Sequence, residues 1–135
     1  MGRSLLILLD THVVLWLASG DVRISRPAHA AIKEARQGGR GLAISDITLM
    51  EIAQLSHRGR IEFVVDLESF LSDIVRRFKV FPISANIAMQ AFELPKSYPN
   101  DPVDRIIGAT ALVEDIPLIT ADGEIRKSRA VPTIW

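Results

Sequence analysis

The chain has 135 residues, the length of one domain, and 48% of them are hydrophobic, enough for a single core. It contains no cysteine, which excludes disulfide bonds and thiolate metal sites. The 16 basic and 16 acidic residues cancel to a formal net charge of zero, whereas a protein that binds nucleic acid through phosphates usually has a basic excess.

The first half of the chain predicts two strands and three helices. Residues 5–9 are all apolar and end at Asp10, a pattern typical of a strand buried on both faces. Helices are predicted at residues 12–18, ending near Gly20, and from Pro27, in the first helical turn, to residue 37. A short strand follows at residues 42–44, and Ser45 or Asp46 is expected to cap a helix at residues 47–57.

The second half continues the alternation. Apolar residues recur with a helical period through residues 66–78. A strand at 79–83, a helix at 85–93, a proline-rich loop, a helix at 102–115 and strands at 117–120 and 131–134 follow. Strands that alternate with helices predict an α/β fold, with a mostly parallel five-stranded sheet covered by helices on both faces. We expect one domain over residues 1–135.

Membrane association is not expected. No apolar run approaches the length of a membrane span. The five-residue run before Asp10 is too short for a signal peptide, and Leu6 stands where myristoylation requires serine or threonine. We therefore expect a soluble protein of the cytoplasm.

Two aspartates follow predicted strands. Asp10 comes directly after residues 5–9, and Asp122 follows the strand at 117–120. Ligands of open α/β sheets bind at the carboxyl ends of the strands, where both side chains would lie. The alternatives are structural: Asp10 caps the next helix, and Asp122 with Gly123 forms an ordinary turn.

Two further acids stand in apolar helices. Glu51 lies between Ile47 and Leu55 in a helix that is apolar almost all round, which predicts burial. Asp104 lies in the first turn of the helix at 102–115. The alternatives are an arginine partner for Glu51 and favourable helix-start electrostatics for Asp104.

These four acids together predict a metal site. If they converge, each pair about 4 Å apart repels by roughly 4 kcal/mol at an effective dielectric near 20. A divalent cation relieves that repulsion, and oxygen ligands without cysteine or paired histidines indicate Mg²⁺ or Mn²⁺. Thr11 is placed to steady the Asp10 carboxylate or a bound water.

Such a site suits phosphodiester hydrolysis. No Walker A motif is present, which argues against a protein that is driven by hydrolysis of a nucleoside triphosphate. Removing four site carboxylates from the 16 acids leaves 12 against 16 basic residues, so the remaining surface carries about +4. The candidate phosphate contacts are Arg58, Arg60, Arg76, Arg77, Lys79, Arg126, Lys127 and Arg129.

The motifs resemble PIN-domain nucleases, and most of all the VapC-type toxins of toxin–antitoxin pairs. The resemblance covers nearly the whole chain and rests on Leu-Asp-Thr-His around Asp10, Ser-Asp-Ile-Thr-Leu-Met-Glu around Glu51, Asp-Pro-Val-Asp-Arg around Asp104 and Thr-Ala-Asp ending at Asp122. It implies a three-layer PIN-like fold and an acidic tetrad that is both catalytic and metal-binding: Asp10, Glu51, Asp104 and Asp122. It also implies an RNA substrate, a cognate antitoxin and a homodimer.

The residues beside the tetrad are expected to support it, namely Thr11, Arg105 and Thr120. Val103 stands where the family often has phenylalanine, a difference expected to affect packing rather than chemistry. Asp101 precedes Pro102 and is expected to be a helix cap rather than a ligand.

One alternative function belongs to a different class. A non-catalytic PIN-fold module would use the same fold only to dock a protein or RNA partner. Such a module should have lost acids from the cluster, whereas this chain retains the complete set.

Overall fold

The computed structural model describes residues 5–135, and the part of the signal-peptide prediction that concerns residues 1–4 lies outside that range. Strands and helices alternate along the described chain as follows: β1 (Leu6–Leu9), α1 (Thr11–Ser19), α2 (Arg26–Gln37), β2 (Gly41–Ser45), α3 (Asp46–His57), α4 (Leu67–Arg77), β3 (Lys79–Phe81), α5 (Ala85–Glu93), α6 (Pro102–Glu114), β4 (Leu118–Ile119), α7 (Gly123–Ser128) and β5 (Thr133–Ile134). None of the helices within residues 5–135 is long and apolar enough to cross a membrane.

The five strands form one sheet in the order β3-β2-β1-β4-β5, with β1 at its centre. Leu8 of β1 lies opposite Ala43 on one side and Leu118 on the other. All four strand pairs are parallel, so the described sheet is parallel throughout rather than mostly. The four residues of β1 are buried, as an apolar run in the middle of a parallel sheet requires.

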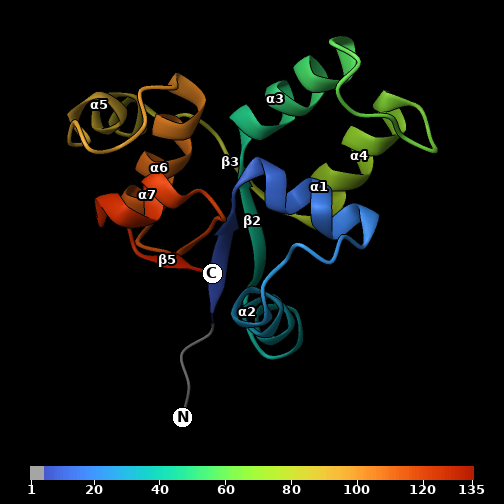
Figure 1. The fold of residues 1–135 in the computed structure, drawn as a ribbon, viewed down its shortest axis with the longest axis horizontal. Helices are drawn as coiled ribbons and strands as arrows, with labels where there is room; N and C mark the ends of the chain where they lie inside the picture. The colour runs from blue at the N-terminus through green and yellow to red at the C-terminus, as the bar shows by residue number, and fades with distance from the viewer. Residues whose placement is uncertain (1–4) are drawn as a thin grey trace.

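Helices cover both faces of this sheet, and the predicted three-layer α/β fold is confirmed (Figure 1). Alternate residues of β1 point to opposite faces. Ile7 and Leu9 pack with the buried residues of α1 and α2, and with Ile52 and Ile74 from α3 and α4. Leu6 and Leu8 pack on the other face with residues of α6 and α7. Helix α5 packs on the outside of α6.

One edge of the sheet gathers the starts of several helices. Helix α1 begins directly after β1, α3 directly after β2, and α7 shortly after β4. Asp10, Ser45 and Asp122 are their N-cap residues, and each side chain accepts a hydrogen bond from a backbone N–H of its own helix. Because the strands are parallel and adjacent, these caps lie at the same edge.

The structure departs from the sequence prediction in two helices. Residues 123–128 form α7, where only a turn at Asp122 and Gly123 was considered. Helix α3 was expected to be buried all round, and that was wrong: only Thr48 and Ile52 are buried in it, and Met50 is 52% exposed. The reason is position, because α3 starts at the edge of the sheet and turns one apolar flank to solvent.

Candidate functional site

Asp10 is the most enclosed acid of the site, with 7% of its surface exposed. Its Oδ1 accepts a hydrogen bond from the backbone N–H of Thr11 at 2.8 Å, and its Oδ2 accepts one from the Thr120 hydroxyl at 2.7 Å. Burial raises the pKa of Asp10, and these two hydrogen bonds partly offset that rise. Asp10 is therefore both a helix cap and a desolvated carboxyl, so the two interpretations of it are compatible.

Glu51 lies half-buried on α3, beside α1. Burial raises its pKa; the Thr11 hydroxyl lowers it, and repulsion from Asp10 raises it again. The Thr11 hydroxyl lies 3.0 Å from that of Thr48, which ties the start of α1 to α3. No ion pair to an arginine was found for Glu51 in residues 5–135, so the alternative of a paired structural glutamate is not supported.

Asp104 has a strongly perturbed carboxyl. Its pKa is raised to about 7, first by burial and then by repulsion from Asp10, Asp101, Asp122 and Glu51, in that order. A helix start favours a charged aspartate, but burial and the surrounding negative charge together outweigh that effect here. Asp101 caps α6 as predicted, accepting from the N–H of Val103 at 2.8 Å.

Asp122 is held by backbone contacts at the end of β4. Its Oδ1 accepts from the N–H groups of Glu124 at 2.8 Å and Ile125 at 3.2 Å, and its own N–H donates to the Thr120 hydroxyl at 3.1 Å. Thr120 thus contacts both Asp10 and Asp122 through a single oxygen. This supporting role was expected for Thr120, but its double contact was not.

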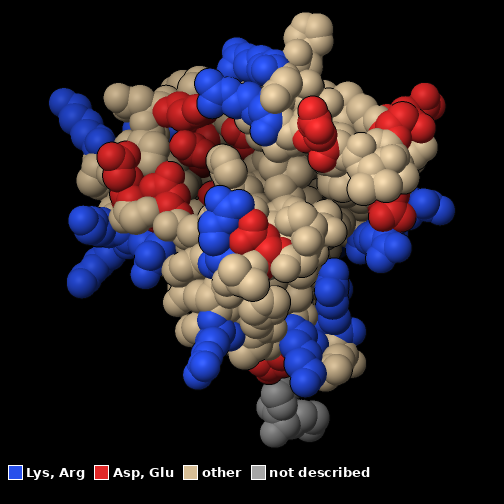
Figure 2. Space-filling model, turned by 45° about the vertical axis from the view of Figure 1, so that its right-hand side comes forward, with Lys and Arg blue, Asp and Glu red and all other residues tan. Residues whose placement is uncertain are grey.

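The four acids share one electrostatic environment. Asp10, Glu51 and Asp122, from three separate segments, each repel Asp104 from the start of α6. The ion pairs among residues 5–135 join Arg23 to Asp21 and Arg76 and Arg77 to Asp73, so none neutralises these four. In Figure 2 acidic side chains gather around a hollow at the upper left of the view, with basic side chains above it.

Arg105 does not contact the acids in the way its place in the motif suggests. Its guanidinium is buried and donates to the backbone carbonyls of Ala91, Leu94, Pro95 and Tyr98, at 3.1–3.4 Å. A cation is favourable at the C-terminal end of a helix, and Ala91 belongs to the last turn of α5. Arg105 therefore fastens α5 and the following loop to α6, the helix that carries Asp104.

Tyr98 is a site neighbour that sequence reasoning missed. It is 1% exposed, and its hydroxyl donates to the backbone carbonyl of Asp104 at 2.9 Å. Burial and the nearby carboxylates raise its pKa, so the phenol stays protonated. The ring packs over Gly108, where an added Cβ would clash with the hydroxyl. A buried aromatic residue in a polar loop was the available signal.

The carboxylates are neighbours without forming a closed set of ligands. Within residues 5–135, no three aspartate, glutamate or histidine side chains are placed to hold one metal ion together. The donor set still fits a hard divalent cation, because it consists of carboxylates that are partly desolvated and mutually repelling.

The comparison with known families decides the identity of this fold. The PIN domain profile matches residues 7–130, which is most of the chain. The chain belongs to the PIN-domain family. The resemblance seen in the motifs is thereby confirmed, and the four acids occupy the carboxyl edge of the sheet in a PIN domain.

Individual relatives point to one branch of the family. The chain is 34% identical over 131 residues to "Ribonuclease VapC22" of Mycobacterium tuberculosis (strain ATCC 25618 / H37Rv), covering 96% of this chain and 98% of the relative. A toxin–antitoxin complex from Klebsiella pneumoniae contains a chain that is 27% identical, with a TM-score of 0.65 and coverage of 93% and 94%. VapBC2 from Rickettsia felis, bound to a promoter DNA fragment, shares the fold at a TM-score of 0.71 and 16% identity, with coverage of 96% and 97%.

Proposed function

We propose that this PIN domain is a metal-dependent endoribonuclease and the toxin of a toxin–antitoxin pair, acting in the cytoplasm. One observation carries the proposal: carboxylates from four separate segments repel one another at one edge of the sheet, and none has a basic partner in an ion pair within the described chain. Such crowding is costly for a protein that uses the fold only for docking. The name and the toxin–antitoxin neighbours of the similar proteins support the same function.

The proposed ligands of the metal are Asp10, Glu51, Asp104 and Asp122, which are also the proposed catalytic residues. Mg²⁺ or Mn²⁺ fits a set of oxygen donors only. When bound, the cation makes a water more nucleophilic and neutralises charge that develops on the phosphate. A carboxyl must be deprotonated to bind the ion. With its pKa raised to about 7, Asp104 is partly protonated near neutral pH, so binding of the ion requires it to release that proton.

The protein's own residues orient this site. Thr120 holds one oxygen of Asp10, and the Thr11 N–H holds the other, so the carboxyl cannot rotate freely. The pairing of β1 with β4 fixes the two threonines relative to each other, because the Asp10 N–H donates to the Ile119 carbonyl at 3.0 Å. We infer that the enclosed acid is preorganised while Glu51 and Asp104 complete the site when the ion binds.

A cleavage assay tests this proposal. The purified protein is incubated with a pool of structured RNAs in Mg²⁺, in Mn²⁺ and in EDTA, alongside the Asp10→Asn variant. Glu114→Gln is the matched control, because Glu114 is an exposed acid at the far end of α6. We expect cleavage only with metal, its loss in Asp10→Asn and its retention in the control. Equal cleavage in EDTA overturns the metal requirement, and no cleavage under any condition favours the docking module.

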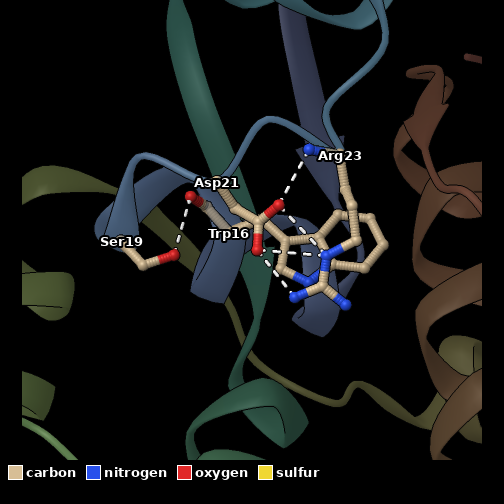
Figure 3. A network of polar contacts seen from close by, with 4 residues as sticks. All are labelled: Trp16, Ser19, Asp21 and Arg23. Carbon is tan, nitrogen blue, oxygen red and sulfur yellow. Dashed lines mark hydrogen bonds and ion pairs between the residues drawn. The ribbon is translucent and has the colours of Figure 1, made fainter.

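The antitoxin is expected to occupy a cavity of about 610 Å³ that runs from α1 to the segment before α4. The apolar side chains that line it include Trp16, Ile61 and Phe63. Figure 3 shows how its rim is held: Arg23 donates to the Asp21 carboxylate and lies over the Trp16 ring, 4.9 Å from the ring centroid. Rigid aromatic walls with charged rims suit a partner segment that carries both apolar and charged residues.

The product of a small reading frame beside the gene is the test partner. Co-expression should abolish RNA cleavage, and Trp16→Ala should restore it by weakening the complex. The control is Leu112→Ala, because Leu112 is exposed on α6 and lies outside the residues that line this cavity. A complex that forms equally well with Trp16→Ala overturns the placement.

We also propose that the chain forms a homodimer. Exposed apolar side chains collect on and beside α5, where Ile83, Met89 and Phe92 are 41%, 55% and 74% exposed. Such a patch is suited to contact between copies. Light scattering should show twice the monomer mass, and Phe92→Asp should halve it. A wild-type protein that is monomeric at assay concentrations overturns this part.

A further inference from the structure

A second hollow lies beside the acidic edge. Its volume is about 420 Å³, and its walls come from the loop before α6 and from α7. The loop leads to Asp101 and to Asp104, while α7 begins after Asp122. Both walls of the hollow are therefore continuous with segments that carry the proposed catalytic acids. We refer to it as the lysine pocket.

The floor of the lysine pocket contacts the site directly. Tyr98 lines the pocket, and its hydroxyl donates to the backbone carbonyl of Asp104. The Ser128 hydroxyl, on the opposite wall, donates to the Ile125 carbonyl and accepts from the Ala130 N–H. These hydrogen bonds hold one residue on each wall of the pocket in place.

The charges of the pocket favour a ligand that is mainly anionic. Lys96 and Lys127 line it from opposite walls, and both are exposed. Neither forms an ion pair with a carboxylate anywhere in residues 5–135. Ser97 and Asn100 add hydrogen-bonding groups, and Glu124 adds one carboxylate. Two cations, one anion and neutral polar groups match a nucleotide, which carries phosphate, hydroxyl and base groups together.

We propose that the lysine pocket binds a nucleotide of the substrate RNA next to the bond that is cut, with Lys96 and Lys127 contacting its phosphate. This inference rests on the proposed ribonuclease function, and it assigns one part of the surface with which the protein would bind its RNA substrate. The chain has no overall basic excess, so its attraction for RNA must come from local cations of this kind. A phosphate held here lies beside α7, which follows Asp122, and beside the loop that leads into α6, the helix that bears Asp104.

The test is RNA binding measured without catalysis. A short fluorescent single-stranded RNA is titrated in EDTA at several salt concentrations, with wild type and with Lys96→Ala/Lys127→Ala. Because both lysines contact one phosphate, the double variant loses one phosphate contact, which should reduce the steepness of the salt dependence of binding by about 0.7 for a single strand. The affinity deficit of the variant then shrinks about fivefold for each tenfold rise in salt.

Two further variants make the result specific. Lys33→Ala/Arg36→Ala is the matched control, because both residues are exposed on α2, away from the pocket. It should bind RNA as wild type does. Glu124→Gln should bind more tightly than wild type, because it removes a negative charge from the pocket wall and keeps an acceptor. A gain of affinity cannot come from damage to the fold.

The outcomes separate the pocket from the nuclease activity. If the double lysine variant binds and cleaves RNA like the control, the pocket assignment is wrong while the ribonuclease proposal stands. If the lysine variant cleaves with a raised KM and a nearly unchanged kcat, the pocket assignment is supported. If wild type neither binds nor cleaves RNA, both proposals fall.

Discussion

The carboxyl of Asp104 makes the metal-free protein less stable, and replacing it with the isosteric amide should reveal by how much. Its pKa lies at about 7 instead of the ordinary 3.8. That difference corresponds to about 4 kcal/mol at ~1.4 kcal/mol for each pKa unit. Asp104 is partly exposed, so screening by water and salt reduces the cost to about 1–2 kcal/mol. In Asp104→Asn this cost disappears.

The sign of the effect depends on pH. A raised pKa means that the folded protein keeps the Asp104 proton at pH values where the unfolded chain has lost it. The wild type therefore loses stability as pH rises from about 4 to about 7 and loses no more above that. Asp104→Asn escapes this loss, so its advantage should be absent near pH 4 and complete at pH 8.

Thermal unfolding in EDTA measures this difference. At pH 8 we expect a Tm about 3–8 °C higher for Asp104→Asn than for wild type. Mg²⁺ should raise the Tm of wild type more than that of the variant, because it stabilises the form that binds it better. A lower Tm of the variant at pH 8, or a gain that is equal at pH 4 and pH 8, would refute the reasoning. Asp73→Asn is the contrasting control, because Asp73 pairs with Arg76 and Arg77 and its loss should cost up to about 1 kcal/mol.

Three further substitutions test single contacts. Thr120→Val removes the hydroxyl that donates to Asp10, so it should raise the Asp10 pKa further and move the onset of cleavage to higher pH. Its free energy of unfolding, measured with urea, should be lower by about 1–3 kcal/mol. Gly108→Ala should destabilise the protein by about 1–3 kcal/mol, although alanine favours helices, because the added Cβ would clash with Tyr98. Arg105→Met should cost about 3 kcal/mol or more, seen as a lower Tm, because buried carbonyls lose their donor.

Matched variants separate these effects from general damage. Thr120→Ser keeps the hydroxyl and should restore both the pH profile and the stability. Gly123→Ala should be neutral or stabilising, because a Cβ there meets nothing within 4 Å. A Gly108→Ala variant as stable as Gly123→Ala would contradict the packing described for Tyr98.

Local signals in the sequence were sufficient to predict much of the fold. The apolar run at residues 5–9 predicted a buried strand, and the capping residues Ser45 and Asp101 predicted where α3 and α6 begin. Gly20 ends α1 with a positive φ of 69°, as its position indicated. Helix α7 was missed because its six residues, which begin at the glycine of an Asp-Gly pair, carry too little periodicity to distinguish a helical turn from a loop.

The neighbourhood of the four acids could be predicted from the sequence, but their contacts could not. Strand ends and helix starts follow from local pattern, and parallel strands bring their carboxyl ends to one edge, so the gathering of the acids there could be anticipated. The hydrogen bond from Thr120 to Asp10 joins residues 110 positions apart, and no local pattern specifies it. The same is true of Arg105, whose place beside Asp104 suggested electrostatic support and whose side chain instead binds the end of α5.

The bridge between Thr120 and Asp10 also bears on the order in which the site can form during synthesis. Asp10 is made before its partner just after β4, because the two residues stand 110 positions apart. A growing chain cannot pair β1 with β4 until that later segment has been made, so a shorter polypeptide lacks the hydrogen bond that orients the Asp10 carboxyl. Under the proposed function, a nascent toxin that has not yet reached β4 therefore has no oriented carboxylate with which to cut RNA.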